Sequence, residues 1–215
     1  FAPYHLCDID NWNQTLYYNY LSAAELADVY KNAVHYKDPV IDTKGWFTDA
    51  LSYRLRLPQK YLAAEYEAHF IGNRTSNMEK FRSVRASYGW CEFGTAPGDS
   101  SGDYETHHET FDSSPLVLSY YDRLLSLLTA NGVNVTVVQA PINQASSDVM
   151  HQAFLDGYRS YLEGQEKKFP GVTFSKDIPV FDNNYFGDSN HLNRTGASLF
   201  TDDLSKYLES IVFTW

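Results

Sequence analysis

Apolar stretches and short polar turns alternate regularly in the second half of the chain. Residues 133–139 are nearly all apolar and β-branched, which is typical of a parallel strand covered on both faces. Helical periodicity on either side predicts helices at 114–132 and at about 146–168, followed by a short strand at 172–174. Their inward faces are predicted to carry Leu116, Tyr120, Leu124, Leu127 and Leu128 in the first helix and Val149, Met150, Phe154, Tyr158, Tyr161 and Leu162 in the second.

A last amphipathic helix is predicted near the end of the chain. Its apolar positions are Ala197, Leu199, Phe200, Leu204, Leu208 and Ile211. The order helix, strand, helix, strand, helix is the rhythm of a doubly wound α/β sheet. A length of 215 residues suits one domain, and we expect residues 1–215 to form it.

The first half has a weaker pattern. Residues 16–21 and 39–41 are predicted to be strands, and the helix between them is capped by Ser22, with Glu25 three residues on. A further helix runs from Pro58 until Gly72 stops it. We interpret residues 44–113 as an insertion, of which 94–103 form an exposed loop.

Composition and charge exclude several classes of protein. The hydrophobic content of 43%, with 17 Tyr and 13 Phe, excludes a disordered chain, and the aromatic residues fit either a tightly packed core or a carbohydrate-facing surface. A formal net charge of −10 disfavours capture of nucleic acid or anionic lipid, because both need clustered Lys and Arg. A nuclease or phosphodiesterase is therefore disfavoured.

Export is weakly indicated. Four N-x-T sequons begin at Asn13, Asn73, Asn134 and Asn193. Cys7 and Cys91 pair if the protein is exported, but two buried thiols explain them equally well. The chain starts at Phe1 rather than Met, so any anchor or export signal would precede it.

A polar loop before the last helix carries the strongest candidate chemistry. Asp188 precedes His191 by three residues, and such a carboxylate orients an imidazole that acts as general base for a hydroxyl nucleophile. Asn143 follows the strand predicted at 133–139, and the carboxyl ends of parallel strands share one edge of a sheet. We therefore expect Asn143 to lie near the loop. The alternative is that Asp188 only caps the helix and His191 is an exposed loop residue.

The residues of this loop resemble a known family. Residues 188–197, Asp-Ser-Asn-His-Leu-Asn-Arg-Thr-Gly-Ala, are similar to the last conserved block of SGNH (GDSL-type) hydrolases, in the variant found in DltD-like and alginate or cellulose O-acetylation proteins of bacterial surfaces. The strand end at 141–143 resembles the third block of that variant, and residues 18–23 resemble the second. The resemblance extends from about Ser114 to the end and from Leu16 to Val34.

The resemblance implies a three-layer α/β sandwich with a mostly parallel, flavodoxin-like sheet, which in this chain lacks its first strand. It implies a Ser-His-Asp triad for acyl transfer or ester hydrolysis, without a metal or other cofactor. Asp188 and His191 take the places of the family's Asp and His. Asn143 and the backbone near Ser22 take its oxyanion positions, although the family prefers Gly where this chain has Ser22.

The nucleophilic serine of the family lies in a G-x-S turn after the first strand. No such turn precedes Tyr4, so we expect the serine upstream of Phe1. Gly98-Asp99-Ser100 has the right tripeptide, but no apolar strand precedes it. We interpret that segment as a loop and Ser100 as a chance match.

Two groups of polar residues are weaker candidates for metal sites. His107 and His108 lie between Glu105 and Glu109, but the further ligands of a closed coordination shell are not evident. Residues 182–188 have oxygen ligands without the spacing of an EF-hand loop.

The sequence and the resemblance together predict an extracytoplasmic O-acyl esterase or O-acyltransferase. Its expected partners are a cell-surface polysaccharide or other acylated glycan and a membrane protein that donates the acyl group. The alternative is a non-catalytic glycan-binding or assembly subunit that kept the fold and lost its serine.

Overall fold

The computed structural model describes residues 2–7, 21–38, 57–87 and 96–212. The chain divides into two compact units, of which the first combines residues 1–7, 92–113 and 118–215 and the second combines residues 8–91 and 114–117. Each unit is described by itself.

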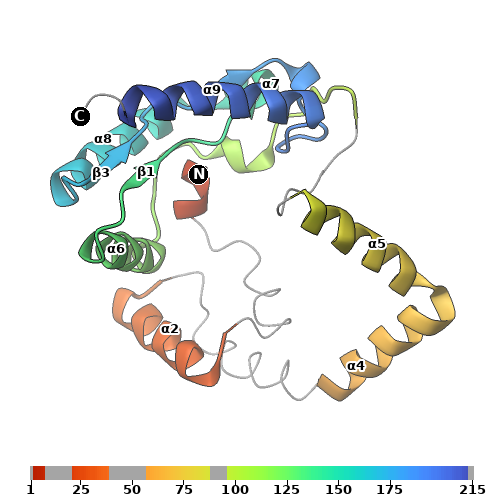
Figure 1. Ribbon diagram of the computed structural model, residues 1–215. Helices are drawn as coiled ribbons and strands as arrows, with labels where there is room; N and C mark the ends of the chain where they lie inside the picture. Colours follow the sequence, from red (N-terminus) through yellow and green to blue (C-terminus); the bar gives the residue numbers. More distant parts are fainter. Residues whose placement is uncertain (1, 8–20, 39–56, 88–95, 213–215) are drawn as a thin grey trace. The chain divides into compact units, whose positions relative to one another are not determined.

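The first unit is built on two parallel strand pairs (Figure 1). β1 (Val135–Val137) pairs with β3 (Val172–Phe174), and β2 (Ile142–Asn143) pairs with β4 (Val180–Phe181). In both pairs the first strand comes from residues 135–143 and the second from residues 172–181. The prediction of an α/β fold with parallel strands is therefore confirmed, and the strand predicted at 133–139 forms β1.

Prolines interrupt the pairing between the two strand pairs. Pro141 and Pro179 lie in the linking segments 138–141 and 175–179, and proline cannot donate to a strand ladder. The Pro179 carbonyl still accepts a hydrogen bond from the Ile142 N–H at 2.9 Å. Because the second linking segment is one residue longer, the register shifts by one residue between the pairs.

α6 (Pro115–Ala130) occupies the predicted helix at 114–132, but part of its inward face was predicted wrongly. Leu125 is buried, whereas Leu124 and Leu127 are 50% and 61% exposed. Tyr121 and Leu128, one turn to either side of Leu125, are half-buried. The buried face of the second half of α6 is therefore shifted by one residue from the predicted face. The prediction failed here because Leu124 and Leu125 are adjacent, so either of them fits the helical periodicity.

The single helix predicted at 146–168 is two helices, α7 (Gln144–Val149) and α8 (Gln152–Lys168). They are separated at Met150 and His151, which adopt extended backbone conformations. Val149, predicted to face inward, is 42% exposed. After the break, α8 buries Phe154, Tyr158 and Leu162 as predicted.

The core of the first unit includes the N-terminal turn. Tyr4 and Cys7, in and after η1 (Pro3–Leu6), cluster with the buried ring of Phe154. Phe111 packs against this cluster, with its ring 5.7 Å from that of Phe154 and 5.3 Å from that of Tyr158. The buried strand residues Val172 and Phe174 lie on β3, against which α8 packs.

The second unit is helical where it is described. α2 (Ala23–Tyr36) begins with the predicted capping box, in which Ser22 and Glu25 exchange hydrogen bonds, and it buries Ala33. α4 (Leu57–Tyr66) continues into the π-helical η2 (Glu67–Ile71) and stops at Gly72, as predicted. The predicted strands at 16–21 and 39–41 lie outside the described residues, apart from Leu21.

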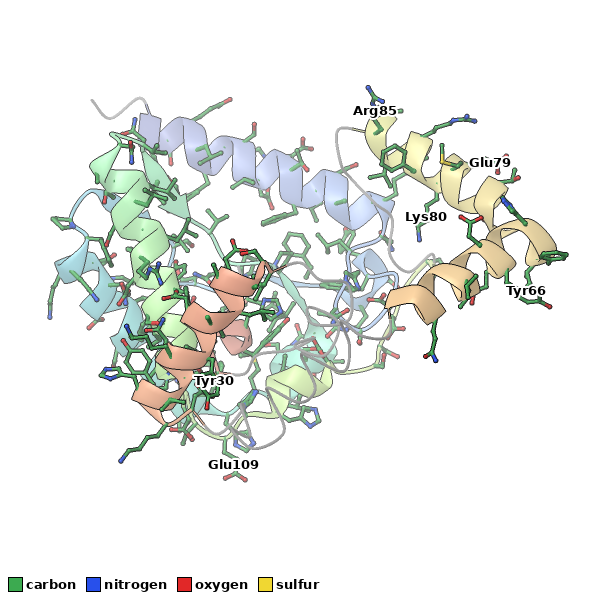
Figure 2. The ribbon with its side chains drawn as sticks, turned by 90° about the horizontal axis from the view of Figure 1, so that it is seen from below. Tyr30, Tyr66, Glu79, Lys80, Arg85 and Glu109 are labelled. Carbon is green, nitrogen blue, oxygen red and sulfur yellow. The ribbon has the colours of Figure 1, made fainter. Side chains whose placement is uncertain are left out.

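A further helix of this unit, α5 (Asn73–Ala86), follows Gly72 directly and was not predicted. Its exposed face carries charged side chains such as Glu79 and Arg85, which point away from the ribbon in Figure 2. Gly72 adopts φ +82°, a left-handed conformation that ends the preceding helix and turns the chain into α5.

α9 (Arg194–Val212) is the predicted last helix. Leu199, Phe200, Leu204 and Ile211 are half-buried, and Leu208 is 38% exposed. Among the described helices, none is long and apolar enough to cross a membrane.

Candidate active site

The candidate site lies in the loop between β4 and α9, residues 182–193, which we call the site loop. β4 ends at Phe181, whose register partner is Asn143 of β2. Asn183 accepts a hydrogen bond from the Ala145 N–H at 3.3 Å. Asn143 and the start of the site loop therefore lie at the carboxyl ends of neighbouring parallel strands.

Asp188 and His191 contact one another within this loop. Nδ1 of His191 lies 3.0 Å from both carboxylate oxygens of Asp188. Because a carboxylate only accepts hydrogen bonds, Nδ1 carries the hydrogen in the neutral ring, and Nε2 then carries the lone pair. The imidazole side chain is 47% exposed, so a substrate in solution can reach it. This is the geometry of a general base and its orienting carboxylate.

The Asp188 carboxylate is held by the backbone of the same loop. Its Oδ1 accepts hydrogen bonds from the backbone N–H groups of His191 at 2.7 Å and of Asn190 at 3.1 Å. Burial raises the pKa of Asp188, but these bonds, together with the His191 side chain, outweigh burial and hold the pKa below its ordinary value of 3.8. Asp188 is therefore ionised at neutral pH.

Backbone pairing closes the site loop around this contact. The Gly187 N–H donates to the His191 carbonyl oxygen at 2.8 Å, and Phe186 and Leu192 form an antiparallel bridge. The Phe186 side chain is fully buried. Backbone hydrogen bonding therefore joins the two sides of the loop next to Asp188 and His191. This limits how far the two side chains can move relative to one another.

Asn193 anchors the loop to its surroundings, a role that was not predicted. Its buried Nδ2 donates to the carbonyl oxygens of Asn184 at 2.8 Å, Phe186 at 3.4 Å and Ala96 at 3.5 Å. Its Oδ1 accepts from the Gly196 N–H at 3.0 Å, as an N-cap of α9 does. The same amide therefore holds both ends of the site loop and begins α9.

Gly196 allows the close approach of α9 to the loop. A Cβ atom at this position would overlap the carbonyl oxygen of Tyr185 and lie 3.0 Å from Cδ2 of Leu192. Only glycine fits here without a shift of the backbone. The Asn directly before the predicted helix is a residue type that often caps helices and could have suggested the role of Asn193.

Asn143 is fully buried, and both of its amide atoms have partners. Nδ2 donates to the carbonyl oxygens of Ser101 at 2.9 Å and Asp99 at 3.4 Å, and Oδ1 accepts from the Ser146 N–H at 2.7 Å, which caps α7. Its role as an oxyanion donor stays a prediction. That role requires Nδ2 to break its hydrogen bonds with the carbonyl oxygens of Asp99 and Ser101.

The segment that carries Ser100 lies against the site loop. The Asp99 N–H donates to the Asn183 carbonyl oxygen at 3.0 Å, and Gly98 packs on Asn184 so closely that a Cβ would lie 3.2 Å from its Cα. Residues 96–103 have no helix or strand, as predicted, and Ser100 is exposed. The structure thus brings the Gly98-Asp99-Ser100 tripeptide to the loop that holds His191, which its position in the sequence did not suggest.

Ser22 and His108, two further candidates, each have a local partner. Ser22 belongs to the second unit, where its hydroxyl accepts from the Glu25 N–H at 3.3 Å. His108 stacks on Phe154, and Glu109 points outward in Figure 2. Within the described ranges, no three His, Cys, Asp or Glu side chains are arranged to hold a metal ion.

The predicted sequons and cysteines are only partly described. Asn134 is exposed, whereas Asn193 is 9% exposed and its Nδ2 lies within hydrogen-bond distance of three carbonyl oxygens, so the folded loop leaves no room for a glycan there. Cys7 is buried, and Cys91 lies outside the described residues.

Two cavities in the first unit lie apart from the Asp188–His191 pair. One, of about 340 Å³, lies along α9. It is lined by residues 138–139 and by some of the residues within 175–181 and 200–207. The other, of about 250 Å³, lies beside α7 and α8. Neither is lined by Asp188 or His191.

Comparison with models of known protein families, with curated proteins and with solved structures finds no match to this chain.

Proposed function

We propose that this chain is part of an SGNH-type O-acyl esterase or O-acyltransferase that acts on an extracytoplasmic glycan. The observation that supports the proposal is the contact between Asp188 and His191, in which both carboxylate oxygens lie 3.0 Å from Nδ1. In this proposal the parallel strand pairs belong to a three-layer, flavodoxin-like sheet. The acyl group comes from an ester or from a membrane protein that donates it.

His191 acts as the general base in this proposal. Nε2 takes the proton of a serine hydroxyl as the serine oxygen bonds to the ester carbonyl carbon. The tetrahedral intermediate collapses, the ester C–O bond breaks, and the leaving alkoxide takes the proton from Nε2. Water or a sugar hydroxyl then attacks the acyl-serine and loses its proton to Nε2 of His191. The second tetrahedral intermediate collapses, the bond between the acyl carbon and the serine oxygen breaks, and the serine oxygen takes the proton from Nε2. The products are the free acid or the acylated sugar, with the serine and the neutral imidazole restored.

Asp188 stabilises the imidazolium that forms twice in this cycle. It is ionised at neutral pH, and its hydrogen bond with Nδ1 favours the ring tautomer that has its lone pair on Nε2. The amide of Asn143 and nearby backbone N–H groups are the proposed donors to the oxyanion.

The nucleophile is proposed to be a serine that precedes Phe1, with Ser100 as the second candidate. Ser100 is exposed, and the backbone N–H of the neighbouring Asp99 donates to the Asn183 carbonyl oxygen of the site loop. Because this contact places Ser100 next to the site loop, Ser100 is tested as a nucleophile directly.

Labelling with a fluorophosphonate tests the proposal. The full-length protein is labelled, digested and analysed by mass spectrometry, which locates the modified serine. We expect one adduct, on a serine that precedes Phe1 or on Ser100, and we expect the His191→Ala variant to lose it while keeping its circular dichroism spectrum. If the native protein takes no adduct at high probe concentration, the proposal fails and the glycan-binding or assembly subunit is favoured.

A further inference from the structure

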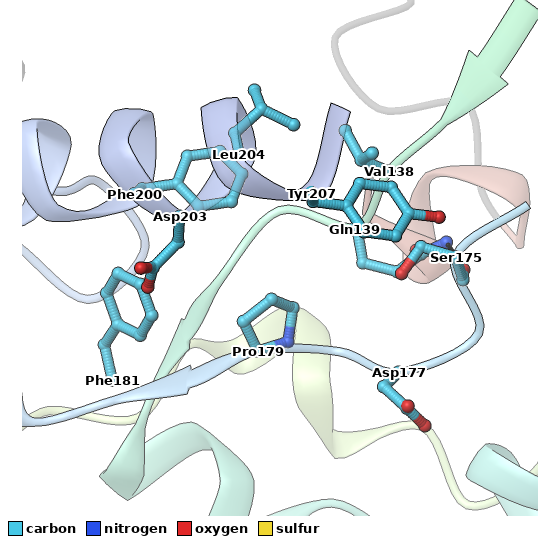
Figure 3. A pocket seen from close by; sticks show the side chains of 10 residues that line it. All are labelled: Val138, Gln139, Ser175, Asp177, Pro179, Phe181, Phe200, Asp203, Leu204 and Tyr207. Carbon is cyan, nitrogen blue, oxygen red and sulfur yellow. Dashed lines mark hydrogen bonds between the residues drawn. The ribbon is translucent and has the colours of Figure 1, made fainter. Parts of the chain in front are cut away.

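The cavity of about 340 Å³ along α9 is an aromatic groove (Figure 3). Phe200 and Tyr207 reach it from α9, and Phe181 reaches it from the end of β4. These three rings are half-buried, so part of each ring is open to a ligand. Its volume lies at the lower end of the range for small-molecule sites.

Aromatic contacts connect this groove to the site loop. The Phe181 ring lies 6.3 Å from that of Phe200 in the groove and 6.1 Å from that of Tyr185 in the site loop. Phe181 is also the register partner of Asn143. α9 begins directly after the site loop, and at 1.5 Å per residue Phe200 lies only about 9 Å along it. The groove therefore starts near Tyr185 of the site loop and extends away from it along α9.

The charged side chains that line the groove are both acidic. Asp203 lies on α9 and Asp177 on the segment before β4, and the lining includes no Lys or Arg. Lys206 and Arg159 pair with these carboxylates at 3.5 Å and 3.9 Å without lining the groove. The lining therefore offers an anionic ligand no cation to bind, so the groove gives such a ligand no favourable charge contact.

The internal polar group of the groove is already satisfied. Gln139 is buried, donates from Nε2 to the Ser175 carbonyl oxygen at 2.8 Å and accepts from the Tyr158 hydroxyl at 2.8 Å. The rest of the lining is chiefly apolar and aromatic, and the groups that can accept new hydrogen bonds are the hydroxyls of Ser175 and Tyr207 and the carboxylate of Asp203.

We infer that this groove is a subsite for an uncharged sugar ring of the glycan. The C–H faces of a pyranose pack on the electron-rich faces of Phe200 and Tyr207, and its hydroxyl groups donate to Asp203, which points from α9 towards Phe181 in Figure 3. A polymer bound here extends along α9 to present a neighbouring sugar to His191. The inference rests on the proposed function, and it adds that the glycan is neutral at this subsite rather than built of uronic acids.

Calorimetric titration of the full chain tests the inference, with cellohexaose as the neutral probe and hexagalacturonate as the acidic one. We expect cellohexaose to bind and hexagalacturonate to bind at least about tenfold more weakly. Phe200→Ala and Tyr207→Ala should each weaken cellohexaose binding about tenfold. Leu208→Ala, on the same helix but outside the groove, should leave it unchanged.

The outcomes separate this inference from the proposed function. All titrations are repeated in the His191→Ala protein, which still binds cellohexaose if the groove is a subsite. Absence of cellohexaose binding, a preference for hexagalacturonate, or equal losses in Leu208→Ala and the two groove variants would each overturn the inference. Fluorophosphonate labelling reports on the nucleophile alone, so either proposal can fail while the other stands.

Discussion

Nδ1 of His191 lies 3.0 Å from both Oδ1 and Oδ2 of Asp188, and the backbone N–H of His191 donates to the same carboxylate at 2.7 Å. One residue thus binds the carboxylate through its side chain and through its main chain. This double contact fixes the plane of the ring relative to the loop, which a side-chain contact alone does not do.

Replacing Asp188 by Asn should reduce turnover far more than it reduces stability. An Asn amide can donate to Nδ1 and so favour the tautomer whose lone pair is on the wrong nitrogen. We expect kcat/KM on an acyl ester to fall about 10³-fold to 10⁴-fold, the scale known for such a change in a triad. Asp202→Asn, on the exposed side of α9, is the matched control and should keep full activity. Equal kcat/KM values in both variants would remove Asp188 from the site.

Stability should depend on pH through the same carboxylate. Burial raises the pKa of Asp188, but hydrogen bonds hold it below 3.8 in the folded protein, so folding favours its ionised form. Its contribution is then fully present above about pH 5 and is lost as the pH falls through the lowered pKa. Because the side chain is 39% exposed, we expect less than about 1 kcal/mol.

Urea unfolding of the native protein and of Asp188→Asn between pH 3 and pH 7 measures this effect. The difference in unfolding free energy between the two should be constant from pH 5 to pH 7 and should shrink below pH 4. A difference that grows on acidification would show that Asp188 is not stabilised as a carboxylate.

Local pattern predicted much of the first unit. The β-branched run at 133–139 predicted a parallel strand because such strands need apolar side chains on both faces, and β1 lies within it. The Asp-x-x-His spacing predicted the contact of Asp188 with His191, since a short loop leaves the two side chains within reach. Both features depend on residues close in the sequence.

Other features depend on packing that no local pattern encodes. Leu124 and Leu125 are equally apolar, and only the neighbouring elements decide that Leu125 is buried. The break between α7 and α8 has neither Gly nor Pro at Met150 and His151. The hydrogen bond of Asn193 with Ala96 spans 97 residues, so the anchoring of the site loop was not predictable from the motif alone.

Gly196→Ala should destabilise the protein by roughly 2 kcal/mol, because the added methyl group overlaps the Tyr185 carbonyl oxygen and forces the loop away from α9. Activity should fall as well, since His191 lies on that loop. The matched control is Gly164→Ala on the exposed face of α8, where a Cβ meets nothing within 4 Å. The control should gain roughly 0.5–1 kcal/mol, because Ala favours a helix interior. Thermal unfolding of both variants, followed by circular dichroism, measures the contrast, and similar melting temperatures would contradict the close packing of Gly196.

Asn193→Ala should release the site loop from its anchor. The substitution leaves the carbonyl oxygens of Asn184 and Phe186 without their donor and removes the cap of α9. We expect a loss of about 2–3 kcal/mol in unfolding free energy, the sum expected of a lost cap and unsatisfied buried groups. Asn190→Ala, whose side chain is exposed in the same loop, should cost less than about 0.5 kcal/mol.

The two Asn variants also separate anchoring from general stability. The ring resonances of His191 in ¹H–¹⁵N spectra report on its contact with Asp188, and we expect them to shift or broaden in Asn193→Ala under conditions where the protein is still folded. In Asn190→Ala they should stay in place, because the backbone N–H of residue 190 still donates to Asp188. Unchanged His191 resonances in a destabilised Asn193→Ala protein would mean that Asn193 supports the start of α9 alone and does not position the His191 ring.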